Sequence, residues 1–595
     1  MLKCRYMANY IFEEFDHSLL RIYRHVVTFF SERRFDVNVL PADTLRVYKE
    51  LEGKYNEDYA LTFVFIMRTA QELHRAWNMT LLTSMTLQRI KDKFNIRMTW
   101  TLGVVKLKFR VEDGGHEIQR IIPYDYDSEY QDVYCRIASA LVEGHIDIQE
   151  ALFYQTEVTK GEHTARSGLF LRDFPGRIIL YPLEAATCAL IFFQGKLDDA
   201  MVAALCGFAA GLVEWTLSSI GGNATKLLDV SAGLVTGIVG SLFYRFNTEG
   251  KYCLSAIFMG TLYWFFFGTA FVIGLLEIIA GELETGVTRF IAVTIKTFVL
   301  CLGASLGMLI ILKEPELEWE TQNAENCGAI YTLDTWWRIP LYILCSISVL
   351  GQYRMPITKY VQALVVMLVG WEVQTRTAEF ISKKHEVNDH YLDNAMSNIL
   401  GAMSAVIMAS IMAYVFDRAR AFFYAGLLHR ESSFRSSAGG TCLYECIKVY
   451  VRLFNILTGG RESDLMKLKM EKKLRKARME LESDDHERGE IAMDQNEKSC
   501  LTEALIDSQG VNIWALLMPA IYQLVPGSLI ARLWFGTIFN TEESNVFSSL
   551  MVIACSLAIG MVLGFALVQA FQGIQDEGLY TIPEDKMDDP EDKCD

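Results

Sequence analysis

The sequence of 595 residues lacks the basic excess that binding to DNA or RNA requires. Its formal net charge is −16, because 72 aspartates and glutamates outnumber 56 lysines and arginines. Proteins that bind nucleic acid neutralise its phosphates with a basic surface, so we expect no nucleic-acid partner. Acidic residues gather in the 313–334 loop, in parts of 481–499 and in the C-terminal tail, a pattern typical of solvated surface.

The chain also lacks the clustered cysteines and histidines of a metal site. Its 13 cysteines are scattered, with no CxxC and no His/Cys group at zinc spacing. We therefore expect no metal, no other cofactor and no dense disulfide framework. The first residues, MLKCRYMANYIFEEFDHSLL, carry charges inside every apolar window, so they do not form a signal peptide. We expect the N-terminus to be cytoplasmic.

Long apolar runs are absent before residue 177 and recur after it. A membrane-crossing helix needs roughly 20 predominantly apolar residues. The sequence predicts an α-helical polytopic membrane protein with about ten transmembrane helices in two five-helix halves. The first membrane module is 177–312, and the second is divided into 336–417 and 511–571, which holds its last two helices. The ten candidate spans are about 178–194, 199–219, 226–245, 254–280, 289–312, 336–352, 357–374, 397–417, 511–534 and 547–571.

Residues 58–176 predict a small soluble α+β domain in front of the membrane modules. Apolar residues return every three or four positions through 58–95, which predicts two amphipathic helices. Alternating polar and apolar residues around Asp113-Gly114-Gly115 predict a β-hairpin. Asp147 lies three residues before Glu150, the spacing of a capping box at the start of another helix.

Four further segments complete the predicted organisation. Residues 1–57 have no clear pattern and no assigned role, 313–335 form an acidic loop, 418–510 form a charged insert and 572–595 form an acidic tail. Connections rich in lysine and arginine stay in the cytoplasm. With the N-terminus inside, the basic insert is cytoplasmic and the acidic loop is extracytoplasmic, so the two charge signals agree.

An odd number of spans in each half means that the second half enters the membrane in the opposite orientation. Inverted repeats of this kind are common in secondary transporters, whose substrate site lies near the membrane midplane on interrupted helices. The stretch ALLMPAIYQLVPGSLIARLWF, residues 515–535, contains Pro519, Pro526 and Gly527. Proline removes a backbone donor and glycine permits a bend, so we predict an interrupted helix at LVPGS. The alternative is a proline kink that only shapes packing.

The stretch GTAFVIGLLEIIAGELETGVTRF, residues 268–290, occupies the corresponding place in the first half. Glu277 lies inside an apolar run and Arg289 lies beyond it. An acid within a membrane segment usually faces a partner or a cavity and marks an ion or substrate pathway. The alternative is that the span ends earlier and that Glu277, Glu282 and Glu284 are interfacial charges.

Other ionisable residues also fall within or between the apolar runs. Glu184, Glu214 and Asp229 lie inside predicted spans. Asp198 and Asp199 lie in the tight turn FQGKLDD between the first two spans. A structural helix cap explains these two aspartates at least as well as a functional role.

Several motifs, taken in order, resemble the threonine/serine exporter family, including its fungal pheromone-regulated membrane protein branch. They are EGHIDIQEA, LEAATCALIFFQGKLDDAMVAALCGFAAGLV, GLLEIIAGELETGVTRF and PAIYQLVPGS. The resemblance implies a carrier that exports small hydroxy amino acids or related small carboxylates, driven by an ion gradient. This chain has Ile273-Gly274 where the family has Pro-Gly. By matching motif, the resemblance places the pathway at Asp198, Asp199, Glu277, Gly286, Arg289, Pro526, Gly527 and Ser528.

The sequence therefore favours a proton-coupled secondary transporter that exports threonine/serine-like amino acids or small carboxylates by alternating access. Arg289 or Arg532 and helix N-termini would hold the substrate carboxylate. The alternative is a membrane-embedded interaction or signalling protein without transport activity. We expect no enzyme, because no nucleophile with its base and no phosphate loop is recognisable. The expected partners are the lipid bilayer and a small molecule, a homo-oligomer stays open, and the expected location is the plasma membrane, with vacuolar or plastid membranes as alternatives.

Glu277 is the expected proton-coupling acid of this mechanism. On the sequence alone, we expect Glu277→Gln to leave folding intact and to abolish gradient-driven export. Normal export by this variant would remove Glu277 from the mechanism.

Overall fold

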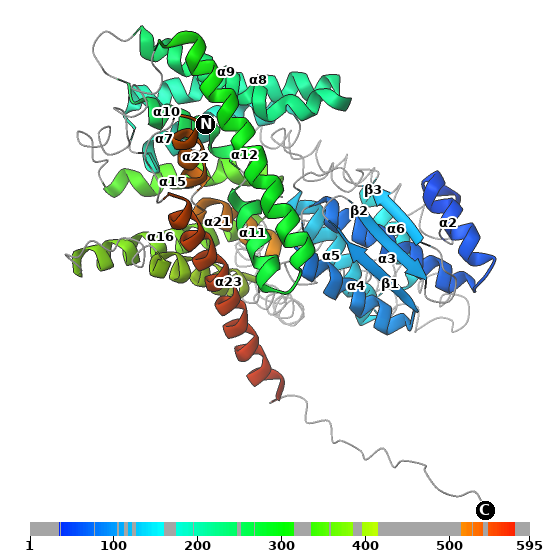
Figure 1. Ribbon diagram of the computed structural model, residues 1–595. Helices are drawn as coiled ribbons and strands as arrows, with labels where there is room; N and C mark the ends of the chain where they lie inside the picture. Colours follow the sequence, from blue (N-terminus) through cyan, green and yellow to red (C-terminus); the bar gives the residue numbers. More distant parts are fainter. Residues whose placement is uncertain are drawn as a thin grey trace, which may run out of the picture.

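The computed structural model of the chain (Figure 1) describes residues of both the N-terminal domain and the membrane helices. The 418–510 insert, Pro526 and nearly all of the 313–335 loop lie outside the described residues, so what was predicted for them stays a prediction. The described residues are Phe35, 37–76, 78–103, 106–111, 117–121, 127–144, 146–159, 174–193, 195–246, 252–266, 268–313, 335–355, 359–384, 395–413, 513–525, 527–539 and 546–577.

The N-terminal domain packs five helices with a three-stranded antiparallel sheet of order β1-β2-β3. Leu107, Phe109 and Val111 alternate with exposed residues along β2 and face the core, as expected for a strand with one buried face. The elements are η1 (Val37–Val39), α2 (Ala42–Glu52), α3 (Glu57–Arg75), α4 (Thr80–Phe94), β1 (Met98–Leu102), β2 (Lys106–Val111), β3 (Glu117–Ile121), α5 (Ser128–Glu143) and α6 (Ile148–Thr159).

The local signals read from the sequence are confirmed in this domain. The amphipathic segment forms α3 and α4, and the turn residues 113–115 lie between the paired strands β2 and β3. The capping box forms reciprocally at α6. The backbone N of Glu150 donates to Asp147 Oδ1 at 2.7 Å, and the backbone N of Asp147 donates to Glu150 Oε2 at 3.2 Å. Helix α2 packs on α3, so the fold begins within the segment that the sequence left unassigned.

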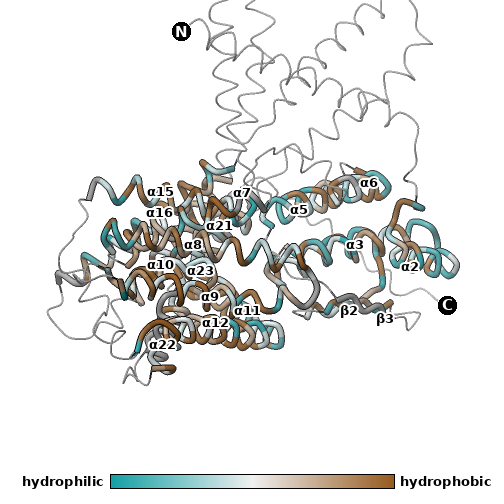
Figure 2. The backbone as a smooth tube through the Cα atoms, turned by 90° about the horizontal axis from the view of Figure 1, so that it is seen from above, coloured by the Kyte–Doolittle hydropathy of each residue, from teal (hydrophilic) through white to brown (hydrophobic). Residues whose placement is uncertain are grey.

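The rest of the described chain is helical and apolar. Figure 2 shows hydrophobic residues predominating along α9, α10 and α12, whereas α2, α5 and α6 carry many hydrophilic residues. The helices are α7 (Phe174–Ile191), α8 (Leu197–Ile220), η3 (Gly222–Leu227), α9 (Leu228–Arg245), α10 (Leu254–Leu262), η4 (Tyr263–Phe265), α11 (Gly268–Ile279), α12 (Leu283–Ile311), α15 (Thr335–Gln352), α16 (Tyr360–Lys384), Ala395–Ala413, α21 (Ile513–Leu524), α22 (Gly527–Ile538) and α23 (Val546–Glu577).

Among the described residues, five helices are long and apolar enough to cross a membrane, and a bent pair makes a sixth. The five are Leu197–Ile220, Ala224–Arg245, Leu283–Ile311, Ala395–Ala413 and Met551–Val568, and the bent pair joins Leu254–Phe265 to Gly268–Ile279. Ile178–Ile191 and Ile513–Leu524 are shorter apolar helices. The chain is therefore a mostly helical membrane protein, and the ten spans in two five-helix halves stay a prediction.

Glycines allow the membrane helices to approach closely at two places. Gly233 and Gly237 of α9 face Gly303 and Gly307 of α12, and a Cβ at Gly237 would overlap the carbonyl oxygen of Ala304. At the second crossing, between α23 and the helix Ala395–Ala413, a Cβ at Gly560 would overlap the carbonyl oxygen of Ile399. Small residues at such crossings let backbones pack directly when lipid supplies no hydrophobic driving force.

We expect Gly237→Ala to destabilise the membrane part of the fold, because the added methyl group has no space against the backbone of α12. Overpacking of this kind costs about 1–3 kcal/mol, measurable as a lower thermal unfolding temperature in detergent. Leu306→Ala, on an exposed position of α12, is the control and should unfold close to the parent protein. Equal stability of all three proteins would contradict the packing described here.

Candidate functional site

Two interrupted helices meet in the interior of the membrane part. The first break follows η4, where Phe266 is extended (φ −75°, ψ 114°) and α11 resumes at Gly268, with 55° between the two helices. The second lies between the end of α21 at Leu524 and the start of α22 at Gly527, where the sequence predicted it. The ring of Tyr522 lies 5.1 Å from that of Tyr263 and 5.4 Å from that of Trp264, so the two breaks are in contact.

The first break is not at Ile273-Gly274, although the family's Pro-Gly corresponds to that position. Gly274 lies inside α11 and faces Gly286 of α12, where a Cβ on Gly286 would come within 2.6 Å of the Gly274 carbonyl oxygen. This pair of glycines closes the α11–α12 hairpin. The missing proline therefore does not prevent an interrupted helix, because the break is located earlier, before α11 begins at Gly268.

A buried carboxylate lies beside the meeting point of the two breaks. Glu184, in the middle of α7, is 1% exposed. Its Oε1 accepts a hydrogen bond from the hydroxyl of Tyr522 at 2.8 Å, and its Oε2 accepts one from Nε2 of Gln352 at 3.0 Å. A carboxylate in an apolar interior needs such donors, because its desolvation is costly. Glu184, Gln352 and Tyr522 are called the Glu184 cluster below.

The Glu184 cluster is surrounded by aromatic rings and by one unused acceptor. Tyr353 packs on Trp264 at 5.6 Å and on Tyr522 at 5.8 Å between ring centroids. Its hydroxyl lies 3.3 Å from Thr269 Oγ1. Gln352 is 1% exposed, and its Oε1 has no hydrogen-bond partner among the described residues. A carboxylate, an open carbonyl oxygen and aromatic faces together suit a cation such as an ammonium group.

Glu277, Gly286 and Arg289, predicted from the sequence to line a pathway, are brought together at the α11–α12 hairpin. Arg289 Nη1 lies 3.3 Å from Glu277 Oε1, and the two side chains are 2% and 0% exposed. The same carboxylate oxygen accepts a hydrogen bond from the backbone N of Thr80 at 3.0 Å. Glu277 is thus ion-paired and also caps the first turn of α4 in the N-terminal domain, next to which the hairpin lies (Figure 1).

The hairpin group is separate from the Glu184 cluster. Glu277 is nine residues along α11 from the break at Gly268, or about 14 Å of helix. Glu184 and Glu277 were both noted from the sequence as acids inside apolar runs. Of the two, Glu184 is the one that hydrogen-bonds to residues of the second predicted half. Glu277 instead joins the membrane part to the N-terminal domain.

Asp199 has a capping role at the opposite end of α10. It is fully buried, and its two oxygens accept 2.7 Å hydrogen bonds from the backbone N atoms of Lys196 and Cys253, which precede α8 and α10. Asp199 therefore holds the starts of two helices together. Asp198 is half-buried in the first turn of α8. This geometry favours the structural interpretation for Asp199 and places neither aspartate in the Glu184 cluster.

The remaining predicted residues lie on α22. Gly527 is its first residue, and Ser528 and Arg532 follow within it, with side chains outside the described part of the chain. Helix α22 packs against α12 and α23. Glu184 was predicted as an intramembrane acid, whereas Gln352 and Tyr522 were not predicted as site residues. Of these two, Tyr522 carried a usable signal, because it lies four residues before the predicted break.

The apolar helices are those of a polytopic membrane protein. Two interruptions with a buried carboxylate between them resemble the substrate sites of secondary transporters. Residues 65–311 match the family model described as "Putative threonine/serine exporter". Over this region the chain is similar to the threonine/serine exporter family. The matched region runs from the N-terminal domain through α12 and includes Glu184, Glu277 and Arg289.

Two curated fungal relatives match parts of the chain. An uncharacterized protein of Schizosaccharomyces pombe is 21% identical over 283 residues, which is 46% of this chain and 34% of that protein. Pheromone-regulated membrane protein 10 of Candida albicans is 24% identical over 180 residues, which is 30% of this chain and 16% of that protein. The matches thus span about a third and about a sixth of these relatives. No solved structure matches the chain.

The ion pair changes the outcome expected for Glu277→Gln. Removing one partner of a buried ion pair leaves the other charge uncompensated, which costs about 3–5 kcal/mol. We therefore expect this variant to unfold at a lower temperature, measured on purified protein in detergent, with Glu277→Gln/Arg289→Gln regaining part of the loss. Glu284→Gln, on the same hairpin but exposed, is the control. A fully stable Glu277→Gln variant with abolished export would instead support the coupling role expected from the sequence.

Proposed function

We propose that the chain is a secondary active transporter that exports a small threonine/serine-like amino acid or a related carboxylate in exchange for protons. The observation that carries this proposal is the Glu184 cluster. One carboxylate of the first half is held by one donor from α15 and one from α21 of the second half, where two interrupted helices meet. A group bonded across the boundary between two halves is affected by any movement of one half against the other.

Helix packing supports a division into two related five-helix halves. Helix α11 packs on α23 and α12 packs on α22, while α7 packs on α15. If α7–α12 and α15–α23 are equivalent halves, the contact of α11 with α23 corresponds to the contact of α22 with α12. In both contacts the fourth helix of one half meets the fifth helix of the other. The glycine crossings of α9 with α12 and of Ala395–Ala413 with α23 also correspond. This pattern is what an inverted repeat produces, with 177–312 and 336–571 as the halves.

The orientation with a cytoplasmic N-terminal domain has independent support from cysteine chemistry. Cys253, directly before α10, is disulfide-bonded, and disulfides persist in oxidising compartments. Helices α10 and α11 together run from Cys253 to the hairpin that contacts the N-terminal domain. The domain and Cys253 therefore lie at opposite ends of this span, the domain in the cytoplasm. We propose the plasma membrane as the location.

The surroundings of Glu184 favour a zwitterionic amino acid over a dicarboxylate. Helices α11 and α22 both begin at the interruptions, at Gly268 and Gly527, and helix N-termini attract a carboxylate. Glu184 and the open Oε1 of Gln352 are acceptors for an ammonium group, and the rings of Trp264 and Tyr353 add faces for a cation.

Proton coupling follows from competition at one carboxylate. Glu184 stabilises the substrate ammonium only when it is ionised. The carrier without substrate changes its orientation at a lower desolvation cost when Glu184 carries a proton. One proton taken up on the outside would thus replace one ammonium released there. Glu277 is the second candidate for this role, and it is already paired with Arg289.

Flux measurements in proteoliposomes test the proposed function. We expect labelled threonine or serine to cross the membrane. The flux should be faster when an imposed proton gradient drives protons in the direction opposite to the substrate, and succinate should be transported more slowly. The measurement is the initial rate for each compound with and without the gradient. Absence of flux for all three compounds would contradict the transporter and favour the interaction or signalling protein.

Replacing the central carboxylate tests the mechanism. We expect Glu184→Gln to reduce proton-driven flux at least tenfold and to remove its response to the gradient, because an amide cannot exchange a proton. The initial rate at several pH values is the measurement, with thermal unfolding to verify the fold. Asp229→Asn, a membrane acid on α9 outside the cluster, is the matched control. An unchanged pH response in Glu184→Gln would exclude Glu184 as the coupling group.

A further inference from the structure

The N-terminal domain is bonded to both membrane halves on one side of the protein. The geometry points to a latch, in which docking of this domain is coupled to the state of the Glu184 cluster through three consecutive residues, Gln352, Tyr353 and Arg354. This inference rests on the proposed function, since it describes how the same site is regulated. The three residues are called the coupling segment below.

The contact with the first half is made by the connection between α3 and α4 and by the end of β1. Met79 is 5% exposed and packs within the core of the membrane helices rather than within that of its own domain. The next residue, Thr80, donates its backbone N–H to Glu277. Thr285 of α12 donates its hydroxyl to the carbonyl oxygen of Leu102 at 3.0 Å. The domain is thus inserted at the α11–α12 hairpin.

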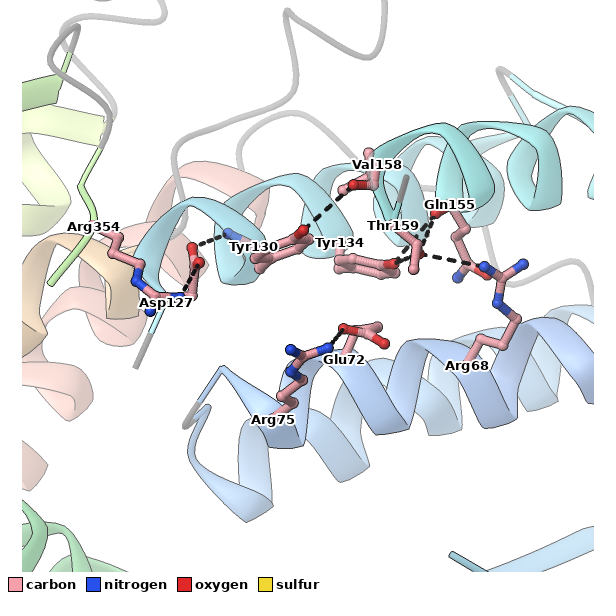
Figure 3. A network of polar contacts seen from close by, with 10 residues as sticks. All are labelled: Arg68, Glu72, Arg75, Asp127, Tyr130, Tyr134, Gln155, Val158, Thr159 and Arg354. Atoms are coloured by element: carbon pink, nitrogen blue, oxygen red, sulfur yellow. Dashed lines mark hydrogen bonds and ion pairs between the residues drawn. The ribbon is translucent and has the colours of Figure 1, made fainter. Parts of the chain in front are cut away.

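The contact with the second half is made by the start of α5. The backbone N of Ser128 donates to the carbonyl oxygen of Tyr353 at 3.1 Å, and Arg354 Nη1 lies 3.4 Å from Asp127 Oδ2. Lys359, at the start of α16, pairs with Asp132. Two cations from the connection between α15 and α16 therefore face two acids on α5, and Figure 3 shows the first of these pairs.

The coupling segment connects this interface to Glu184 without an intervening residue. Gln352 donates to Glu184, and the ring of Tyr353 packs on Trp264 and Tyr522. The carbonyl of Tyr353 and the side chain of Arg354 hold α5. Arg354 has φ +51°, a left-handed conformation that non-glycine residues rarely adopt. Such a residue persists where surrounding contacts determine it, so undocking would also release this conformation.

Helix α5 cannot follow the coupling segment alone, because polar contacts hold it to the rest of its domain. Figure 3 shows these contacts along α5. The hydroxyl of Tyr130 donates to the carbonyl of Val158, and that of Tyr134 lies 2.8 Å from Thr159 Oγ1. Arg68 of α3 donates to the same Thr159 Oγ1 at 3.4 Å. The domain therefore moves as one body and spans both halves.

A body bonded to two halves resists their relative movement. When the halves rearrange, the domain must release one of them, so docking stabilises the arrangement described here and slows its opening on the domain side. By linkage, a change at Glu184 that alters the position of Gln352 changes docking by the same free energy. The acids of α5 thus keep the N-terminal domain docked, and a change in the charge of Glu184 changes the stability of the docked state.

The test uses the full chain in lipid nanodiscs and in proteoliposomes. Asp127→Asn keeps the hydrogen bond from Tyr130 that caps α5 but removes the charge facing Arg354, and Arg354→Asn removes the cation while tolerating positive φ. We expect each variant to raise amide hydrogen exchange at Ser128–Gln131 at least fivefold and initial flux at least twofold. Arg376→Asn, which breaks an exposed ion pair with Glu372 on α16, is the matched control and should change neither.

The reverse direction of coupling is measured without any substrate. Glu184→Gln should change exchange at Ser128–Gln131 at least threefold relative to the parent protein, although it lies in a different part of the fold. Exchange that rises in Asp127→Asn with unchanged or reduced flux overturns the latch, as does unchanged exchange in both Asp127→Asn and Glu184→Gln. If the parent protein shows no flux but Glu184→Gln alters exchange at α5, the transport proposal fails while the coupling stands.

Discussion

A carboxylate buried among apolar helices must receive hydrogen-bond donors from the protein, and this requirement organises the centre of the molecule. Both oxygens of Glu184 are satisfied by residues far away in the sequence, 168 residues for Gln352 and 338 for Tyr522. Satisfying them fixes α7 against α15 and α21. The same contacts place the two helix interruptions together, because Tyr522 packs on the residues of the first break.

Features set by neighbouring residues could be predicted from the sequence. Helices α3 and α4 follow from apolar spacing, the β2–β3 hairpin from its turn residues, and the start of α6 from Asp147 and Glu150. The interruption before Gly527 followed from Pro526, which cannot donate a backbone hydrogen bond. The first interruption carries no proline, and it was not located because an extended Phe266 among aromatic residues has no distinctive sequence signal.

The roles of the two acids could not be separated by sequence, since each is one carboxylate inside an apolar run. What distinguishes them is the partner. Glu277 meets Arg289 twelve residues later and the backbone of Thr80 in another domain, whereas Glu184 meets two neutral donors across the predicted boundary. The charge of Glu277 is thus compensated by a guanidinium, whereas that of Glu184 is met by neutral hydrogen-bond donors. Only the tertiary arrangement contains this difference.

The hydrogen bond from Thr80 to Glu277 also has a consequence for biogenesis. The last helix of the N-terminal domain ends at Thr159, and Glu277 is added to the growing chain about 118 residues later. At roughly 5–20 residues per second of synthesis, the domain waits about 6–24 seconds before its partner exists. During that interval Met79 has no membrane core to enter and α4 lacks its hydrogen bond to Glu277, so the newly made domain exposes this apolar side chain until the α11–α12 hairpin is inserted.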